Sequence, residues 1–365
     1  MYKKTTKKEV RKDAEKVAKE WYIDKQIILR ASGSLDSVPV FDHFAQLVFT
    51  ESASRVKRGE RSDRLVKDEK HIYEKNVKEF FGYRLVNEIN YKLLEEFVNK
   101  LTTRGLASAS IKRIMSFIMK TLKMAMRSDQ LDKLPLFPTV SLKQEVRGWF
   151  SMEDYTRLRN AARDLVYSTE REDVALKRVR GTRIDMEMRF FIIFMVNTFL
   201  RPSDVKQLQH KHIEVVRDKQ RNRYLRINTP FSKTSNTPII SMAVGVEVYK
   251  RLCDFQVDKG FGKEEDFIFL PQYSEDRGFA LEMLRRQFNV VMKFAGMKST
   301  VSGQNRTIYS LRHTAIMLRL IKGDNVDLLT LARNARTSVE MIDRFYARHL
   351  TAEMNLEKFQ SVRGR

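Results

Sequence analysis

The chain is poor in the residues and patterns on which several classes of protein depend. Its 365 residues include one cysteine, Cys253, so neither an internal disulfide nor a cysteine-based zinc site can form. A single thiol suits a reducing cytosol. No run approaches the roughly 18 consecutive apolar residues of a membrane span. The basic N-terminal residues precede no apolar segment of the signal-peptide kind, and we expect a soluble cytoplasmic protein.

Motifs for nucleotide hydrolysis and metal catalysis are also missing. The sequence has no glycine-rich phosphate-binding loop, which argues against an ATP-driven enzyme. No acidic residues stand in a motif typical of a two-metal nuclease. His210 and His212 could form part of a metal site, but no acidic or cysteine cluster accompanies them in the sequence. We therefore expect neither a metal ion nor a cofactor.

Acidic residues are scarce relative to basic ones. The chain has 69 Lys and Arg against 46 Asp and Glu, a formal net charge of +23 and a pI near 10.0. Such an excess is not needed for folding and causes self-repulsion. Nucleic acid explains it most simply, because neutralised phosphates release counterions and thereby supply affinity. The alternative is a soluble protein that is merely basic.

The first 148 residues divide into an extension, a helical domain and a linker. Residues 1–35 form a basic extension, in which apolar residues at helical spacing predict a helix over 7–30. Residues 36–133 are predicted to be a bundle of helices and the core DNA-binding domain. Within it, Gly82 is expected to terminate one helix and Asn90 to cap the next. Residues 134–148 contain two prolines and little periodicity, which predicts a linker.

The helix expected from about Ser108 carries basic residues between its apolar positions. We expect these residues to be exposed: Lys112, Arg113, Lys120, Lys123 and Arg127. Any one of them is most simply part of a solvated face. Together with the net charge, they predict a surface that contacts DNA phosphates.

Residues 149–365 show helical patterns interrupted by short strand patterns. Ser151 and Asp154 resemble a capping box, and the apolar run 185–200 predicts a buried helix. Strands are expected around 213–217, 223–228 and 237–242, and helices near 243–257, 279–296, 309–321 and 338–346. The predicted fold class is a mostly α N-terminal domain followed by an α+β domain, mainly helical with a small antiparallel sheet.

Four separated residues of this second domain indicate phosphodiester chemistry. Arg201, Lys233, Arg312 and Tyr346 lie in the motifs TFLRPSD, PFSKT, YSLRHT and TSVEMIDRFY. Guanidinium groups are planar, permanently charged and able to donate hydrogen bonds in pairs, which suits the non-bridging oxygens of a phosphate. A phenol is a weak nucleophile near neutral pH and needs a base or a cationic site. Each residue alone is most simply a surface or packing residue, so the combination is the informative observation.

These motifs resemble those of the tyrosine recombinases, the phage-integrase family, over roughly residues 38 to 360. The resemblance implies that Tyr346 attacks the phosphate to give a 3′-phosphotyrosyl link, that Arg201 and Arg312 stabilise the charge, and that Lys233 protonates the leaving 5′ oxygen. It implies double-stranded DNA as partner, a homotetramer on DNA and accessory DNA-bending proteins. It also implies no cofactor, and a bacterial, archaeal or viral origin with a location at the nucleoid.

Two positions depart from the family's pattern. A histidine is usual three residues before the second arginine, where this chain has Tyr309. A histidine or tryptophan is usual nine residues before the nucleophile, where it has Thr337. Both side chains can donate hydrogen bonds to a phosphate, but neither is a good general base at neutral pH. The group that takes the Tyr346 proton is therefore open, and His313 is expected to buttress the fold.

Three functions remain compatible with the sequence. The resemblance favours a site-specific recombinase that integrates or excises a mobile element. A type IB topoisomerase-like nicking and rejoining enzyme would share its chemistry, and a catalytically decayed DNA-binding protein would share its fold. The basic extension could bind accessory DNA sites, pack on the helical domain or mediate assembly. The tail that carries Ala352, Leu356 and Phe359 could dock on a neighbouring subunit or on its own domain.

Overall fold

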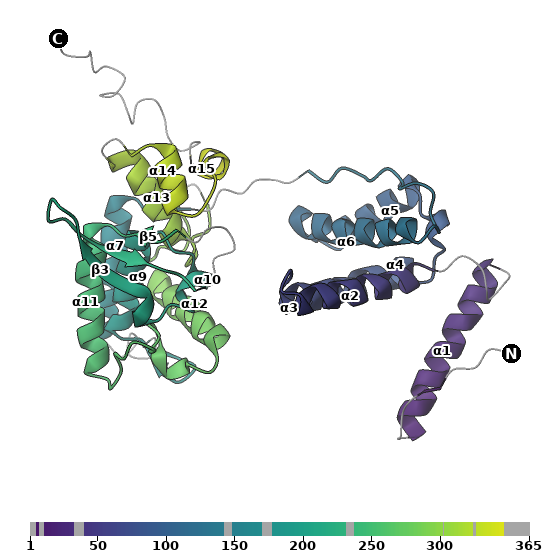
Figure 1. Cartoon of the computed structure of the whole chain (residues 1–365), viewed down its shortest axis with the longest axis horizontal. Coiled ribbons are helices and arrows are strands. Elements are labelled where there is room, and N and C mark those ends of the chain that lie inside the picture. Colours follow the sequence, from purple (N-terminus) through teal and green to yellow (C-terminus); the bar gives the residue numbers. More distant parts are fainter. Residues whose placement is uncertain are drawn as a thin grey trace, which may run out of the picture. The chain divides into compact units, whose positions relative to one another are not determined.

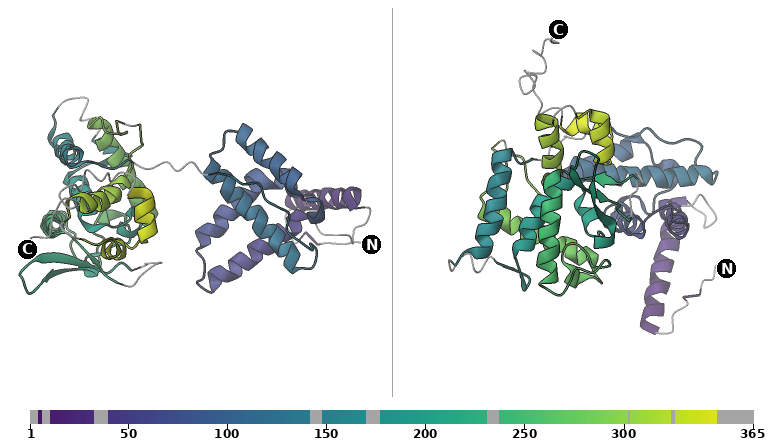
Figure 2. Two further views of the ribbon diagram at one scale, coloured as in Figure 1. Left: turned by 90° about the horizontal axis from the view of Figure 1, so that it is seen from above. Right: turned by 60° about the vertical axis from the view of Figure 1, so that its left-hand side comes forward.

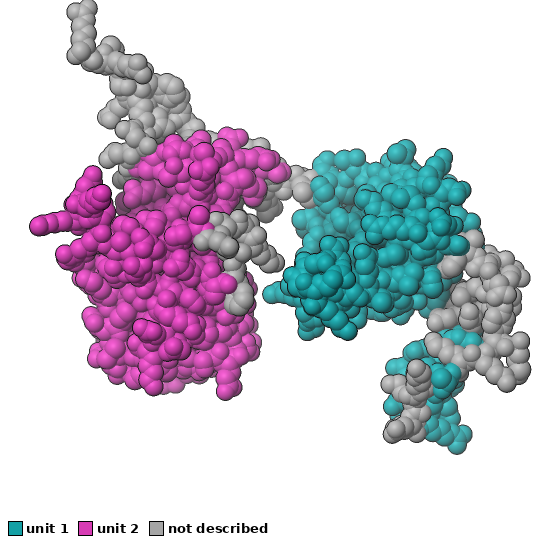
Figure 3. Space-filling view, viewed as in Figure 1, with its two compact units in different colours: residues 1–144 teal, residues 145–365 magenta. Residues whose placement is uncertain are grey.

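The computed structural model describes residues 5–6, 11–32, 40–141, 148–169, 177–230, 237–301, 303–323 and 326–346. The chain divides into two compact units, residues 1–144 and 145–365 (Figures 1 and 3). Each unit has its own hydrophobic core. No helix in the described ranges is both long and apolar enough to cross a lipid bilayer.

The described elements of unit 1 are all helical, as predicted. Helix α1 (Arg11–Ser32) corresponds to the helix expected in the basic extension. The bundle that follows consists of α2 (Phe41–Lys57), α3 (Asp63–Ile72), a π-helical turn (Tyr73–Val77), α4 (Lys78–Phe81), a 3-10 turn (Val86–Glu88), α5 (Tyr91–Thr103) and α6 (Ser108–Arg127). Helix α6 packs against α2, α3 and α5 (Figure 2). Its core is rich in aromatic rings, with Phe49 and Phe117 stacked at 5.7 Å.

Two helix boundaries in unit 1 test the sequence predictions directly. Asn90 caps α5, because its side-chain oxygen accepts a hydrogen bond from the backbone of Leu93 at 3.1 Å, and this prediction is confirmed. Gly82 ends α4 as predicted, and with φ −49° and ψ −41° its backbone is right-handed. A Cβ at this position would lie 2.5 Å from the carbonyl oxygen of Lys78. Glycine is therefore needed here for close packing.

Unit 2 combines a helical body with two small antiparallel sheets, which confirms the predicted fold class. Its helices are α7 (Met152–Tyr167), α9 (Met186–Thr198), α10 (Pro202–Val205), α11 (Ala243–Val257), α12 (Arg277–Phe294), α13 (Ser310–Lys322), α14 (Leu328–Asn334) and α15 (Val339–Tyr346), with 3-10 turns at His210–His212 and Pro271–Tyr273. Strands β1 (Arg178–Val179) and β2 (Thr182–Arg183) form a hairpin. Strands β3 (Ile213–Arg217), β4 (Arg223–Ile227) and β5 (Ile239–Ile240) form a sheet in the order β3-β4-β5.

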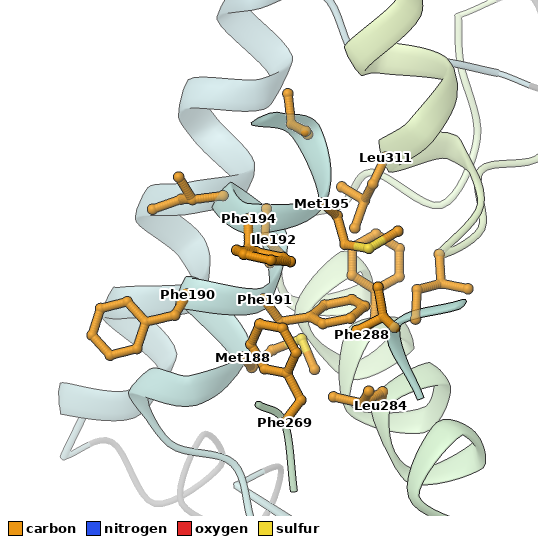
Figure 4. Packing of buried hydrophobic residues seen from close by; sticks show 14 of the residues in the cluster. Met188, Phe190, Phe191, Ile192, Phe194, Met195, Phe269, Leu284, Phe288 and Leu311 are labelled. Atoms are coloured by element: carbon orange, nitrogen blue, oxygen red, sulfur yellow. The ribbon is translucent and has the colours of Figure 1, made fainter. Parts of the chain in front are cut away.

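Helix α9 is the centre of the unit 2 core, as its apolar sequence predicts. It packs against α7, α11 and α13. Phe191 and Phe194 place their rings 5.2 and 5.5 Å from that of Phe269 (Figure 4). The helix ends before Phe199, which adopts the left-handed conformation with φ 57°. Pro202 is the first residue of α10, a position that suits proline because no backbone N–H is needed there.

Glu187 is an ionisable group inside this core. It is 4% exposed, and one carboxylate oxygen accepts a hydrogen bond from the backbone of Leu270 at 2.6 Å. Burial raises the pKa of Glu187 from 4.5 to about 7, and the Leu270 hydrogen bond opposes that rise. The folded protein thus retains a proton that the unfolded chain has lost between pH 4.5 and 7.

We expect Glu187→Gln to stabilise unit 2 at pH 8 and to have little effect at pH 4.5. The stability that the raised pKa provides is present below pH 4.5 and is lost as the pH rises through 7. At about 1.4 kcal/mol per pKa unit, that loss is about 3 kcal/mol. Glutamine keeps the acceptor for Leu270 and carries no charge. Denaturant unfolding at both pH values measures the effect, with exposed Glu247→Gln as control. An equal effect of Glu187→Gln at both pH values would contradict this assignment.

Candidate active site

A second, smaller hydrophobic cluster supports the end of unit 2 where α13, α14 and α15 lie together (Figure 1). Its buried members are Phe199, Ala315, Ile316, Met317, Leu331, Ala332, Ala335 and Ile342. These residues come from the end of α9 and from all three helices. The cluster therefore fixes the two corners that follow α9 and α14 relative to the helix that carries Tyr346.

Arg201 lies at the first of these corners. It is the N-cap residue of α10, and its side chain is 29% exposed. One Nη donates a hydrogen bond to the backbone oxygen of Arg336 at 2.5 Å, and the other lies 3.7 Å from the carboxylate of Asp204. Ser203 lies inside α10, and its hydroxyl donates a hydrogen bond to the carboxylate of Asp204 at 3.3 Å. The guanidinium is oriented but remains accessible.

Arg312 is the third residue of α13 and is only 2% exposed. Its Nη1 donates to the backbone oxygen of Phe199, and its Nη2 donates to that of Ala335. Both acceptors lie at helix C-termini, where backbone oxygens lack intrahelical partners and the helix dipole favours cations. The side chain is therefore held by groups that compensate its burial.

The two predicted arginines are brought to one turn. Arg312 binds the oxygen of Ala335, and Arg201 binds the oxygen of the next residue, Arg336. This turn ends α14 with two backbone hydrogen bonds, from Arg336 to Arg333 at 3.0 Å and from Thr337 to Ala332 at 2.9 Å. The pattern is a Schellman motif, and Arg336 occupies its left-handed position with φ 48°.

Arg336 is a site residue that the sequence analysis did not single out. It is 5% exposed, and burial lowers the pKa of its guanidinium, which Asp204 partly offsets. Its Nη1 donates to the hydroxyl of Thr229 and its Nη2 to the backbone oxygen of Thr237 at 2.6 Å. The sequence shows Arg336 between the second arginine motif and the helix that carries Tyr346, but an arginine alone does not indicate a site. No element was expected there.

A groove of about 930 Å³ opens beside these groups. It is lined by Arg201, Thr237, Pro238, Thr330, Arg333, Asn334, Arg336, Thr337, Ser338 and Met341. Thr337 and Arg201 thus line the same groove. The predominance of arginine and hydroxyl groups along this wall suits an anion such as a phosphate.

Tyr309 lies on a different concavity. It lines a pocket of about 480 Å³ together with Pro202, Ser203, Arg285, Asn289, Thr307 and Ile308. Its ring is 5.1 Å from that of His313, which is half-buried. Tyr309 therefore adjoins the Arg201 corner through Pro202 and Ser203, but it does not line the groove that contains Thr337.

Lys233 and the side chain of Tyr346 fall outside the described part of the chain. Lys233 lies outside the described residues, between Thr229 and Thr237, which Arg336 binds. Tyr346 is the last residue of α15, and its side chain is outside the described set. Helix α15 itself is anchored by Ile342, which is 1% exposed. The tail residues Ala352, Leu356 and Phe359 also lie outside the described residues.

The basic residues expected on α6 are mostly exposed. Lys112, Arg113, Lys123 and Arg127 are exposed, whereas Lys120 is half-buried. The Nζ of Lys120 donates to Glu69 at 3.0 Å and to Ser52 at 2.8 Å. The expectation that Lys120 is exposed is wrong, because α2 and α3 supply these acceptors at the same position along α6.

The two histidines considered as metal ligands have protein partners. The ring nitrogens of His210 lie 2.9 Å from the Tyr249 hydroxyl and 2.7 Å from the Gln256 side-chain oxygen. His212 accepts a hydrogen bond from the backbone of Gln209 at 3.0 Å. Within the described ranges, no three histidine, cysteine or acidic side chains gather as metal ligands would.

The fold has solved counterparts, although no sequence profile of a known family and no curated protein sequence matches the chain. A Tn1549 transposon integrase in complex with transposon right end DNA superposes with a TM-score of 0.62 at 14% identity, covering 88% of this chain and 100% of that chain. A lambda integrase dimer bound to a COC′ core site gives 0.61 at 15% identity, covering 83% and 94%. The chain has the tyrosine recombinase fold. The recognition made from the sequence motifs is confirmed at this level.

The tyrosine recombinase fold extends over both units. A lambda integrase tetramer bound to a Holliday junction matches with a TM-score of 0.58 at 16% identity and covers 90% of this chain and 88% of its own. Both the helical N-terminal unit and the α+β unit are thus part of the shared architecture. The roles of individual residues stay predictions, since identities of this size establish the fold alone.

Proposed function

We propose that this protein is a site-specific DNA recombinase of the tyrosine type that serves integration or excision of a mobile element. The observation that carries the proposal is the turn after α14. Its two successive carbonyl groups orient Arg312 and Arg201, and the helix that begins three residues later ends at Tyr346. The tyrosine recombinase fold and the net charge of +23 support the same reading.

The proposed reaction exchanges one phosphoester for another. The Tyr346 hydroxyl gives its proton to water, its oxygen attacks the phosphorus, and the bond from phosphorus to the 5′ oxygen breaks. Lys233 gives a proton to that oxygen, which leaves a 3′-phosphotyrosyl link and a free 5′ hydroxyl. Arg201 and Arg312 stabilise the charge on the non-bridging oxygens, the kind of preorganised contact that usually contributes most to catalysis. The phosphotyrosine retains the bond energy, so a partner strand's 5′ hydroxyl can reverse the step.

DNA is proposed to contact the exposed basic residues of α6 in unit 1 and, separately, the groove of unit 2. Exposed Lys112, Arg113 and Lys123 of α6 are proposed phosphate contacts, and half-buried Lys120 would have to leave Glu69 to join them. Strand exchange needs two duplexes and therefore a tetramer on DNA, which the match to a lambda integrase tetramer on a Holliday junction supports. Tyr309 and Thr337 are proposed to donate hydrogen bonds to the phosphate or to the groups around it.

A nicked suicide duplex that carries the element's own junction tests the proposal. Cleavage near the nick releases a short fragment, so the covalent intermediate accumulates and is visible on a denaturing gel. We expect a shifted band that needs the specific site. A band from any duplex, with relaxation of plasmids that lack the site, would indicate topoisomerase-like activity instead. Absence of a band with every junction sequence, despite DNA binding, would identify a decayed enzyme.

A further inference from the structure

Arg336 occupies a position for which its residue type is unusual. It is the left-handed residue of the Schellman motif after α14, with φ 48°. Glycine is the common residue there, because it adopts this conformation without a steric penalty. An arginine at 5% exposure also adds a buried cation close to Arg201. A residue that is unfavourable for both the backbone and the charge needs a compensating role in the site.

The guanidinium of Arg336 holds both sides of one loop. Thr229 lies two residues after β4, and Thr237 lies two residues before β5. One Nη binds the Thr229 hydroxyl and the other binds the Thr237 carbonyl oxygen at 2.6 Å. The planar fork of an arginine holds two Nη groups at a fixed separation, so each can bind a different acceptor, whereas lysine must make all its hydrogen bonds from one nitrogen atom. Lys233 is in the segment between these two threonines.

A second contact reinforces the same connection. The side chain of Asn334 accepts a hydrogen bond from the backbone N–H of Ile240 at 2.8 Å and donates one to the oxygen of Ile240 at 3.0 Å. It therefore pairs with β5 as a neighbouring strand would. The end of α14 is thus fixed to the strand that follows the loop, and Arg336 adds the link across the loop's two ends.

The backbone around Arg336 contacts the two candidate catalytic arginines, Arg201 and Arg312. Its carbonyl oxygen accepts the hydrogen bond from Arg201, and the preceding carbonyl accepts one from Arg312. Through one residue, the arginine pair is therefore connected to both ends of the Lys233 segment. The Nε of Arg336 has no hydrogen-bond partner among the described residues. Its two Nη groups donate hydrogen bonds to Thr229 and Thr237.

We propose that Arg336 is a positioning residue, which acts by fixing Thr229 and Thr237, the two described residues that flank the Lys233 segment in the sequence, relative to Arg201 and Arg312. The inference rests on the proposed cleavage reaction, in which Lys233 protonates the leaving oxygen. Arg336 acts through the loop and does not need to touch the DNA. Because misplacement of a reacting group by about 1 Å can cost about 100-fold in rate, we expect an effect of that size on cleavage.

Three variants separate this role from charge and folding. Arg336→Gly removes the fork and supplies the residue that the left-handed position favours, so α14 should still end correctly. Arg336→Lys retains the positive charge but replaces the two separated Nη donors with a single nitrogen, so it cannot reproduce the geometry of both threonine contacts. Arg180→Gly is the matched control, because Arg180 is an exposed arginine with φ 49° in the turn between β1 and β2. We expect single-turnover cleavage to fall about 100-fold in both Arg336 variants and to stay within about twofold in the control.

A change of leaving group identifies the step that Arg336 supports. In a suicide duplex with sulfur in place of the bridging 5′ oxygen, the leaving group is a thiolate. A thiol has a pKa near 8.5, far below that of an alcohol, so its departure needs no proton donor. If Arg336 positions Lys233, the defects of Arg336→Gly and Lys233→Ala should both shrink from about 100-fold to a few-fold with the sulfur duplex. The DNA affinity of each variant is measured in parallel.

The outcomes distinguish the inference from the function on which it rests. If the unmodified protein forms no covalent complex with either duplex, the proposed function fails. If it cleaves both and Arg336→Gly cleaves the oxygen duplex at the same rate, only the positioning role fails. The positioning role also fails if the sulfur duplex restores the cleavage rate of Lys233→Ala but leaves the rate defect of Arg336→Gly as large as with the oxygen duplex. Unfolding midpoints within a few degrees of each other confirm that the variants are folded.

Discussion

Tyr346→Phe is expected to abolish the covalent protein–DNA complex and to leave non-covalent binding of the site within about twofold. The substitution removes one oxygen atom, the proposed nucleophile, from the last residue of α15. Ile342 and the cluster beneath it hold the helix, and we therefore expect Tyr346→Phe to leave the fold of unit 2 unchanged. The denaturing gel with the suicide duplex measures the first effect, and a mobility shift at fixed salt measures the second.

Tyr167→Phe is the matched control for this prediction. Tyr167 is the last residue of α7, 68% exposed, and belongs to the same unit. Its loss should leave the covalent complex unchanged. A DNA-linked peptide that maps to any tyrosine other than Tyr346, or a covalent band that persists in Tyr346→Phe, would refute the assignment of the nucleophile. Tyr309 is the residue to examine first in that event, because it adjoins the Arg201 corner.

The parts of the fold that could be predicted from the sequence are those with strong local signals. The apolar run of α9, the periodicity of α6 and the Asn90 cap each depend on residues within one element. Helix α14 has only seven residues, which is too short for a periodic pattern to be distinctive. It is formed because Leu331 and Ala332 pack into the cluster under the site. The left-handed Phe199, which ends α9, likewise has no glycine to mark it.

The sequence predicts candidate site residues, but it does not predict the groups that hold them. The motif contexts of Arg201 and Arg312 were recognisable, whereas their acceptors are backbone oxygens 135, 113 and 23 residues away in the chain. A carbonyl group belongs to every residue, so no sequence pattern marks these partners. The same reason applies to Lys120, whose burial depends on Glu69 and Ser52 from two other helices.

Arg312→Lys is expected to lower the cleavage rate by about 100- to 1,000-fold, the range for loss of one preorganised donor to a developing charge. Lysine keeps the charge but has one nitrogen in place of a planar fork, so it cannot reproduce the geometry in which two separate Nη groups bind Phe199 and Ala335 and present the same face to a phosphate. Arg201→Lys should cause a similar loss of rate. Single-turnover cleavage measures both, and a loss below about tenfold in either variant would contradict a direct role in charge stabilisation.

The alanine variants separate the two arginines by their effect on stability. Arg312→Ala leaves two buried carbonyl groups without a donor, and each such group costs about 1–3 kcal/mol. Arg201 is 29% exposed, so water can replace it at the Arg336 carbonyl, and we expect Arg201→Ala to change the unfolding free energy by less than about 1 kcal/mol. Denaturant unfolding of both variants checks this. If Arg201→Ala destabilises unit 2 as much as Arg312→Ala does, Arg201 has a structural role, and the proposal that its guanidinium binds phosphate is wrong. If the two differ as expected, Arg312 is the fixed cation of the site and Arg201 the accessible one, a division that follows from two corners of the same fold.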